Sequence, residues 1–520
     1  MKVGDILKKI NILVAFLLVL FTLVACNNTD DTNDKPIVEE ITIPYFTVDK
    51  TIYQLGDKVV CNLFNYEDCD RVTLTEFGRE PNNKYTLNYR EIGEENVVEI
   101  PTKKLTKGGD YTLWLCGSDA NDYIYTVDIH IDDSDTNDYG VKDVKIDVSK
   151  EGNITNSKLT IKTDYTNLLT YRIYWCKDNV RLDDYMPIRS FISSNLNEII
   201  VEFPTNMYKP KEANSLEVFV SEGVSTSYFI NVGNELNLNN SEYVFTFNAI
   251  SDLHVQSLRD SMLFNAHLKT TLQDIYDSNS KAILGVGDIT NFGKASEYEF
   301  VESIFDSVIN KNNIPFYASI GNHEYMYFDT FSEPVGYFKN HFNLDSHYYS
   351  FTVNNYKFIA LGTDNTSLYG IMNNEQLVWL ENELKNVQEN EVVFIMIHQG
   401  LMDTVDGTLK TKYNQDDYGF ISNNDRLRNI LKNYPNAVVF SGHSHQTLDG
   451  YVPVLYGNGK DASFANCGSN SYLNSYDDSE IGGTEGLFIE VYKDYILIRG
   501  KEFSYGKWIA NCQIVLPLNK

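Results

Sequence analysis

Basic residues are scarce in this chain. Its 520 residues include 43 lysines and arginines against 72 aspartates and glutamates, which gives a formal net charge of −29. A general nucleic-acid partner needs a basic face that neutralises phosphates, so this charge argues against that class of partner. It does not exclude a small anionic substrate held by a bound metal ion, because such an ion is often the largest local charge.

The segment at residues 10–25 is a sixteen-residue apolar run in which Asn11 and Thr22 are the polar members. It is short for a membrane span and, with lysines ahead of it, is typical of a secretory signal. The sequence "LVAC" that ends at Cys26 resembles a bacterial lipobox. That resemblance implies cleavage before Cys26, whose acyl chains would anchor an exported protein on the extracytoplasmic face of the membrane. An uncleaved helix, or a cleaved signal with a free Cys26, is the alternative.

Cysteines are also few, and no pair has the spacing Cys-x-x-Cys. The sequence therefore gives no support for thiolate zinc sites or thioredoxin-like redox chemistry. Export would permit disulfides. Cys61 and Cys116 lie in apolar runs of one region, where a disulfide and two buried thiols are both reasonable expectations.

Patterning divides the chain after the polar tether at residues 26–38. Residues 39–133 and 141–235 contain short alternating runs, such as "KVVCNLF" and "TYRIYWCKD", separated by turn residues. This pattern predicts two all-β, immunoglobulin- or fibronectin-like sandwiches. From residue 243 to residue 520, buried strand-like runs alternate with amphipathic helical stretches, which predicts an α/β domain with a largely parallel sheet.

Polar residues with metal-ligand chemistry follow five of the predicted strands in this last region. In chain order they are Asp252 and His254, then Asp288, then Asn322, His323 and Glu324, then His398, and finally His443 and His445. The carboxyl ends of strands in open α/β sheets meet in one crevice. The sequence therefore predicts that these groups converge.

Such a crevice favours cations, because neighbouring carboxylates repel and buried polar groups need partners. Nitrogen and carboxylate ligands without thiolate suit zinc, manganese, iron, cobalt or nickel. Without His323 and Glu324, seven candidate ligands remain, which exceeds the need of one ion. Two ions that share a carboxylate are the natural solution. The sequence does not select among these metals.

Taken in order, the motifs D-x-H, G-D, G-N-H-E, a lone histidine and G-H-x-H resemble the calcineurin-like metallophosphoesterases over residues 243–520. The resemblance implies two mixed sheets flanked by helices (an αββα sandwich). It assigns one metal to Asp252, His254, Asp288 and His445. It assigns the second metal to Asp288, Asn322, His398 and His443. Asp288 would then bridge the ions, and His323 would assist the substrate or leaving group.

The sequence departs from the family at Asn291. The family often has aspartate there, and purple acid phosphatases have an iron-binding tyrosine, so no purple ferric centre is expected. Asn291 either stabilises its turn or touches substrate. Glu324 either orients His323 or lies at the loop surface, and it is also a candidate substrate contact. Gln399, Tyr325 and Asn470 are candidate pocket residues. His341 and His347, in an aromatic-rich loop, are expected to be structural.

The sequence therefore predicts a surface-anchored hydrolase of phosphoric esters. By the resemblance, a hydroxide that bridges the two ions attacks phosphorus in line, and His323 helps to stabilise the leaving group. The substrate is a phosphate ester, either small or polymeric, and either a monoester or a diester. One alternative is a surface adhesin or glycan-binding protein with an inactive phosphoesterase domain. A nuclease or nucleotidase is another, and the net charge disfavours the nuclease.

Overall fold

The computed structural model describes most of the chain from residue 44 to residue 519. The residues between them that it leaves out are 51, 67–68, 77–80, 82–84, 94, 106–107, 118–122, 133–140, 148–156, 164–167, 194–197, 222–224, 233–240, 257–261, 310–313, 365–369, 389, 410–423 and 476–479. The predicted signal, Cys26 and the polar tether lie outside the described residues. None of the described helices combines the length and apolarity needed to cross a bilayer.

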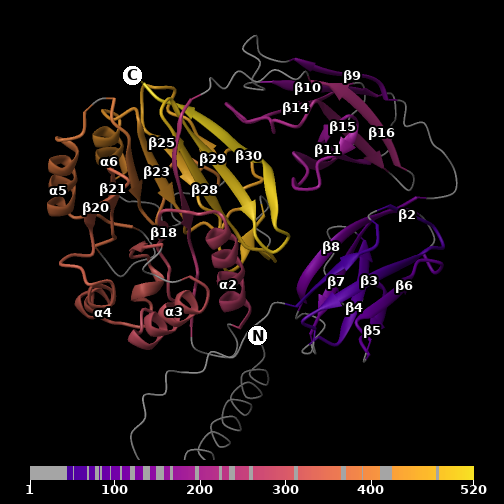
Figure 1. Ribbon diagram of the computed structural model, residues 1–520, viewed down its shortest axis with the longest axis horizontal. Coiled ribbons are helices and arrows are strands. Elements are labelled where there is room, and N and C mark those ends of the chain that lie inside the picture. The colour runs from indigo at the N-terminus through magenta and orange to yellow at the C-terminus, as the bar shows by residue number, and fades with distance from the viewer. Residues whose placement is uncertain are drawn as a thin grey trace, which may run out of the picture. The chain divides into compact units, whose positions relative to one another are not determined.

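The first β region consists of two sheets (Figure 1). Their buried side chains form one apolar core. The three-stranded sheet contains β1 (Tyr45–Val48), β3 (Lys58–Phe64) and β6 (Val97–Pro101). The five-stranded sheet contains β2 (Ile52–Gln54), β8 (Tyr123–Asp132), β7 (Gly109–Cys116), β4 (Arg71–Glu76) and β5 (Thr86–Glu91). Along β3 every second residue is buried, as the period of a sandwich strand requires. Cys61 and Cys116 are buried thiols rather than a disulfide.

The second β region repeats this arrangement with its own pair of sheets. One sheet contains β9 (Val141–Asp147), β10 (Lys158–Thr163) and β14 (Ile199–Glu202). The other contains β11 (Leu169–Lys177), β12 (Val180–Arg181), β13 (Arg189–Ser193), β15 (Ser215–Ser221) and β16 (Ser225–Asn231). Trp175, Tyr171 and Val218 are fully buried between them. Both regions are thus all-β sandwiches, as the alternating runs predict.

The third region has two six-stranded mixed sheets. In spatial order the first contains β19 (Phe316–Ser319), β18 (Ile283–Val286), β17 (Tyr243–Ile250), β28 (Glu485–Tyr492), β29 (Tyr495–Glu502) and β30 (Lys507–Pro517). The second contains β20 (Tyr349–Val353), β21 (Tyr356–Ala360), β22 (Val393–Met396), β23 (Ala437–Ser441), β25 (Ser463–Asn466) and β24 (Val454–Leu455). A short pair, β26 (Leu473–Asn474) and β27 (Glu480–Ile481), lies apart from both. The prediction of two mixed sheets is confirmed.

Helices cover the outer faces of these sheets (Figure 1). The first sheet shares one apolar cluster with α2 (Met262–Asp277), α3 (Ala295–Val308) and α4 (Ser332–Phe342). The second shares another with α5 (Asn374–Leu384) and α6 (Asn424–Leu431). Between the sheets, the ring of Phe247 lies 4.7–5.9 Å from the rings of Phe358, Phe394 and Phe440. This core fixes how the ends of β17, β22 and β23 face one another.

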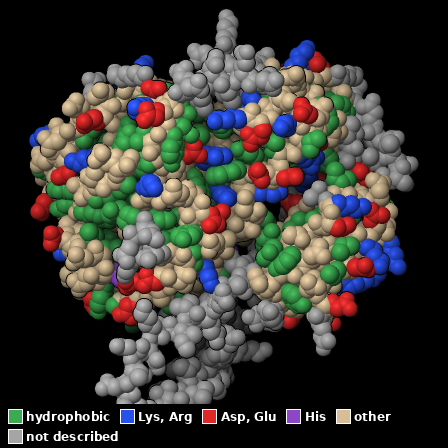
Figure 2. Space-filling model, in the orientation of Figure 1, with side chains coloured by type: hydrophobic (Ala, Val, Ile, Leu, Met, Phe, Trp, Pro, Cys, Tyr) green, Lys and Arg blue, Asp and Glu red, His purple; other side chains and the backbone are tan. Residues whose placement is uncertain are grey.

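Two details of this region differ from the sequence-based expectation. His341 lies in α4 rather than in a loop. Pro334 does not break this helix, because it falls within the first turn, where a missing N–H costs nothing. The carboxy-terminal strands β28–β30 join the first sheet in antiparallel order, so this sheet is only half parallel. On the face shown in Figure 2, basic side chains are interspersed with acidic ones.

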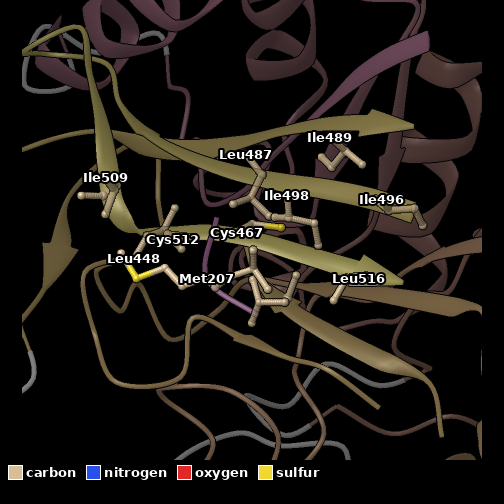
Figure 3. Packing of buried hydrophobic residues seen from close by; sticks show 14 of the residues in the cluster. Met207, Leu448, Cys467, Leu487, Ile489, Ile496, Ile498, Ile509, Cys512 and Leu516 are labelled. Carbon is tan, nitrogen blue, oxygen red and sulfur yellow. The ribbon is translucent and has the colours of Figure 1, made fainter. Parts of the chain in front are cut away.

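The second β region also shares apolar core with the third. Met207, which follows β14, is 1% exposed and belongs to the same cluster as Ile509, Cys512 and Leu516 of β30 (Figure 3). The adjacent Tyr208 donates a backbone hydrogen bond to the carbonyl of Gln513. The chain between residues 203 and 210 is therefore anchored on β30.

Candidate metal centre

The ends of β17, β18, β19, β22 and β23 bring all of the predicted ligands together. Five of them have left-handed backbone conformations, with φ between +47° and +69°. They are Asp252, His254, Asp288, His443 and His445. This conformation is costly for residues other than glycine and concentrates at functional sites, where surrounding structure imposes it. The sharp turns point the side chains back over the strand ends.

Glycines in the same motifs permit the close approach of these turns. A Cβ atom at Gly321 would lie 2.2 Å from Asp288 Oδ1, and one at Gly442 would lie 1.8 Å from Ser251 Oγ. Neither position therefore has room for a side chain. The glycines of G-N-H-E and G-H-x-H are thus required by packing around the carboxylates.

One group of ligands consists of Asp252, His254 and His445, whose nearest ligand atoms lie within 4.8 Å of one another. His445 Nε2 lies 3.1 Å from Asp252 Oδ1 and 3.2 Å from His254 Nε2. All three residues are at most 4% exposed. Their ligand atoms thus surround a point shielded from bulk water.

The hydrogen bonds of the Nδ1 atoms determine whether the Nε2 atoms of His445 and His254 can bind a metal ion. His445 Nδ1 donates to the carbonyl of Tyr472 at 3.0 Å, and His254 Nδ1 donates to Asn291 Oδ1 at 3.2 Å. In the neutral rings both Nε2 atoms then carry lone pairs, and no proton lies between them. Two lone pairs 3.2 Å apart repel each other unless a cation lies beside both. This arrangement therefore fits a metal ion.

A second group consists of Asp288, His398 and His443, with Asn322 beside it. His398 Nδ1 donates to the carbonyl of Val286 at 2.8 Å, so Nε2 is an acceptor when the ring is neutral. That atom lies 3.0 Å from Asp288 Oδ2 and 3.2 Å from Asn322 Oδ1, both acceptors. The same carboxylate oxygen is 3.9 Å from His254 Nε2 in the first group. Asp288 therefore faces both groups, as a bridging ligand must.

Burial and mutual charge shift the titration of this centre. Burial, reinforced by His445 for one and by His398 for the other, lowers the pKa of both His254 and His443 to about 3. Burial opposes ionisation of Asp252, but His445 and His398 outweigh it and hold its pKa below the ordinary value. Neutral His254 and His443 and an ionised Asp252 are the protonation states that metal ligation requires. Burial of His398 is outweighed by Asp288 and Asp252, which raise its pKa to about 10, so metal binding would displace a proton from His398.

His323 lies at the mouth of the centre and is half-buried. Its backbone N–H donates to Asp288 Oδ1 at 2.8 Å, and its ring packs edge-on against His254 with the ring centres 4.2 Å apart. Its Nδ1 lies 3.2 Å from both Asn291 Oδ1 and the Asn291 carbonyl. The ring is thus oriented by Asn291, and its Nε2 makes none of these contacts.

Glu324 requires a correction, since it is fully buried rather than at the loop surface. Its carboxylate accepts hydrogen bonds from the backbone N–H groups of Asp288, Thr290 and Gly321 at 2.7–3.2 Å, and from the Thr290 hydroxyl. A group with no exposed surface cannot contact a substrate that arrives from solvent. The carboxylate of Glu324 therefore holds together the loops that carry Asp288 and His323.

The remaining pocket candidates have different positions. Gln399 is 1% exposed, and Asn470 is fully buried with its amide donating to Thr271 and Thr484. Tyr325 is 1% exposed and donates to the carbonyl of Thr363. Asn291 is half-buried and accepts from His254 and His323, which extends its expected turn-stabilising role to two site histidines. Asn291 thus contacts two histidines of the centre directly.

Sequence reasoning did not identify Tyr472. Its carbonyl fixes the orientation of His445, and its ring lies 4.2 Å from the His445 ring, centre to centre. The Val286 carbonyl has the same role for His398. Both act partly through backbone atoms, which every residue possesses, so residue identity carries no signal of these roles.

Comparisons with known proteins agree with this geometry. Residues 245–447 match the family described as calcineurin-like phosphoesterase, which confirms the resemblance inferred from the motifs. A protein of Arcobacter nitrofigilis named probable glycerophosphodiester phosphodiesterase GpdQ is 22% identical over 215 residues, which cover 38% of this chain and 70% of that protein.

Two solved structures show weaker likeness. Escherichia coli alpha-2-macroglobulin activated by porcine elastase is 10% identical with a TM-score of 0.15, over 39% of this chain and 22% of that one. Murine CEACAM1b is 13% identical with a TM-score of 0.14, over 36% of this chain and 98% of that one. These two likenesses carry no argument about fold or function.

Proposed function

We propose that the calcineurin-like phosphoesterase domain at residues 245–447 hydrolyses phosphoric esters with two divalent metal ions. The observation that carries this proposal is the arrangement around Asp288. One of its oxygens faces His398 Nε2 at 3.0 Å and His254 Nε2 at 3.9 Å, one histidine from each ligand group. A carboxylate in this position suits an ion on either side.

In this proposal each ligand group holds one ion. Asp252, His254 and His445 hold one ion, Asn322, His398 and His443 hold the other, and Asp288 is shared. The bound ions supply charge neutralisation for the phosphoryl oxygens and a water of lowered pKa as nucleophile. The ions are manganese, iron, zinc, cobalt or nickel, because nitrogen and oxygen ligands serve all of these.

His323 is the residue positioned to act on the substrate. Its Nδ1 is held by Asn291 and its ring lies at the edge of the centre, so its Nε2 is available to the leaving-group oxygen. We assign it the donation of a proton or hydrogen bond to that oxygen. Its backbone N–H donates to Asp288 Oδ1, which links His323 to the carboxylate that faces both ligand groups.

Phosphodiesters are the first substrate class to test. The support is the name of the Arcobacter nitrofigilis relative, a probable glycerophosphodiester phosphodiesterase. Monoesters remain the second class, since the ligand set alone serves both. We also propose that the enzyme acts at the cell surface through lipidation of Cys26, on the basis of the lipobox-like sequence "LVAC".

The test uses protein that begins at residue 27, purified and loaded with each candidate metal. We expect about two equivalents of metal per chain by elemental analysis, and turnover of a chromogenic phosphodiester. Asp288→Ala should abolish turnover and reduce the metal content, whereas Asp277→Asn, on the surface at the end of α2, should change neither. A wild-type protein that binds no metal and hydrolyses neither diesters nor monoesters would instead favour a binding protein.

A further inference from the structure

A short loop beside His323 presents an unusual lysine. Residues 287–294 connect β18 to α3, and Asn291 in this loop contacts the His323 ring at 3.2 Å. Met326 donates its backbone N–H to the carbonyl of His323, so the next residue, Tyr327, also stays near this histidine. Lys294 Nζ lies 4.0 Å from the ring centre of Tyr327 and 4.9 Å from that of Phe292. The two segments that flank His323 therefore meet at Lys294.

The loop that carries Lys294 is fixed in place. Glu297, which is 3% exposed, accepts hydrogen bonds from the backbone N–H groups of Phe292 and Lys294 at 2.9 and 3.2 Å. Gly293 donates to Thr290 Oγ1, and a Cβ atom on Gly293 would lie 1.8 Å from the carbonyl oxygen of Glu324. The Lys294 loop thus packs directly on the loop that carries His323, with no room for a side chain between them.

Lys294 has no ion-pair partner among the described residues, and its charge acts on the carboxyl of Glu297 only at longer range. Within the part of the chain that the structure describes, no carboxylate oxygen lies within 4.0 Å of its Nζ, and its side-chain partners are the two aromatic rings. The chain as a whole has an excess of acidic groups, with a net charge of −29. Tyr327 and Met326 are 64% and 60% exposed beside it. An ammonium group without a close ion-pair partner, on an exposed aromatic platform, is an arrangement suited to an anionic ligand.

We propose that Phe292, Lys294 and Tyr327 form a leaving-group subsite that selects phosphate esters whose leaving alcohol carries its own negative charge. The inference rests on the proposed function, because it is the position of His323 that makes this side of the centre the leaving-group side. The two rings contact the body of the alcohol, and Lys294 pairs with its carboxylate or phosphate. A substrate with a neutral leaving group makes only the ring contacts.

Matched substrates test this subsite directly. Methyl phenyl phosphate and methyl 4-carboxyphenyl phosphate differ only in a carboxylate on the leaving phenol, and the corresponding monoesters form a second pair. The measured quantity is the ratio of kcat/KM for the charged substrate to kcat/KM for the neutral one. Each protein hydrolyses both substrates, so their different intrinsic reactivity cancels when the ratios of variants are compared.

We expect Lys294→Gln to lower this ratio about fivefold, the effect of one partly exposed charge pair, and Lys294→Glu to lower it further. Tyr327→Leu should lower the ratio in part, because Lys294 loses its closer ring, whereas Tyr327→Phe retains the ring and should preserve it. Lys281→Gln is the matched control, since Lys281 lies at the opposite end of β18 and is exposed. It should leave the ratio unchanged.

A binding measurement separates failure of the subsite from failure of the proposed function. Calorimetric titration of metal-loaded protein compares phenylphosphonate with 4-carboxyphenylphosphonate, neither of which needs to react. Tighter binding of the charged phosphonate that disappears in Lys294→Gln supports the subsite even if no ester is hydrolysed, in which case only the proposed function fails. Hydrolysis with equal ratios in wild type and Lys294→Gln, or equal loss on both substrates, would overturn the subsite and leave the hydrolase intact.

Discussion

His254 Nε2 and His445 Nε2 face each other at 3.2 Å, and the hydrogen bonds of their Nδ1 atoms leave neither facing nitrogen with a proton. His443, two residues before His445, belongs to the other ligand group with Asp288 and His398. The motif G-H-S-H therefore contributes one histidine to each group. This division leads to the first prediction.

Replacement of either motif histidine should empty one metal site selectively. We expect His445→Ala and His443→Ala each to retain about one equivalent of metal instead of two, with turnover lowered at least about a hundredfold. Elemental analysis after gel filtration gives the stoichiometry. If both ions were lost together in both variants, a single chelate would be the better description.

Asn291 should affect two histidines at once. Its Oδ1 accepts from Nδ1 of both His254 and His323, so Asn291→Ala removes the orientation of a metal ligand and of the leaving-group residue together. We expect kcat to fall about 10- to 100-fold and metal affinity to weaken, the usual effect of losing a group that orients a ligand. Asn382→Ala, an exposed replacement on α5, serves as the control in both measurements. A fall in kcat with unchanged metal affinity would show that only the His323 contact matters.

Much of this arrangement follows from sequence periodicity. Apolar runs such as that of β22 predict buried strands, and the hairpin between β20 and β21 turns at Asn354 and Asn355 because both have positive φ. The ligands themselves were recognisable because each follows a strand, and strand ends converge in α/β folds. The sequence is informative wherever a local pattern is sufficient to determine the position of a side chain.

The remaining features depend on tertiary contacts. The sharing of Asn291 between two histidines, and the use of the Tyr472 and Val286 carbonyls, arise when distant segments meet. Glu324 shows the same limit, because a charged residue next to a catalytic motif suggests an exposed role. Its burial becomes apparent only when three backbone N–H groups from two loops are placed around it.

Glu324 should be critical for stability. Glu324→Ala leaves the N–H groups of Asp288, Thr290 and Gly321 buried without their acceptor, at a cost of about 1–3 kcal/mol each. We therefore expect a large drop in the free energy of unfolding and loss of metal binding, measured by denaturant titration of the metal-free and metal-loaded protein. Glu333→Ala, exposed in the first turn of α4, should be near neutral. Wild-type stability in Glu324→Ala would mean that solvent reaches these amides.

Glu502 should make the free energy of unfolding depend on pH, independently of the metal centre. It is 2% exposed and lies opposite Glu485 in the register of β28 and β29. Burial raises the pKa of Glu502 to about 7, against an ordinary value of 4.5. The folded protein thus keeps a proton that the unfolded chain releases, so this contribution to stability is complete below about pH 4.5 and is lost as pH rises toward 7.

The measurement is thermal or denaturant unfolding between pH 4.5 and pH 8. Glu502→Gln should remove this part of the slope, on the order of 3 kcal/mol across the range, so the variant gains most relative to wild type at high pH. Parallel pH profiles for the two proteins would contradict a protonated Glu502.

Met207 tests whether the second β region is a detachable spacer or part of the core of the third. Its side chain is buried in one cluster with Ile514 and Leu516 of β30, and the backbone bond from Tyr208 to Gln513 fixes it there. Met207→Asp places a charge in this contact, and Met207→Ala removes about 2–5 kcal/mol of packing. Because β30 lies in the sheet that ends in Asp252 and Asp288, we expect both variants to unfold the phosphoesterase domain at a lower denaturant concentration, the aspartate more so.

Val180→Asp, at a side chain 68% exposed in the same β region, should have little effect. If Met207→Asp left metal content and the unfolding midpoint of the phosphoesterase domain unchanged, the second β region would be an independent spacer.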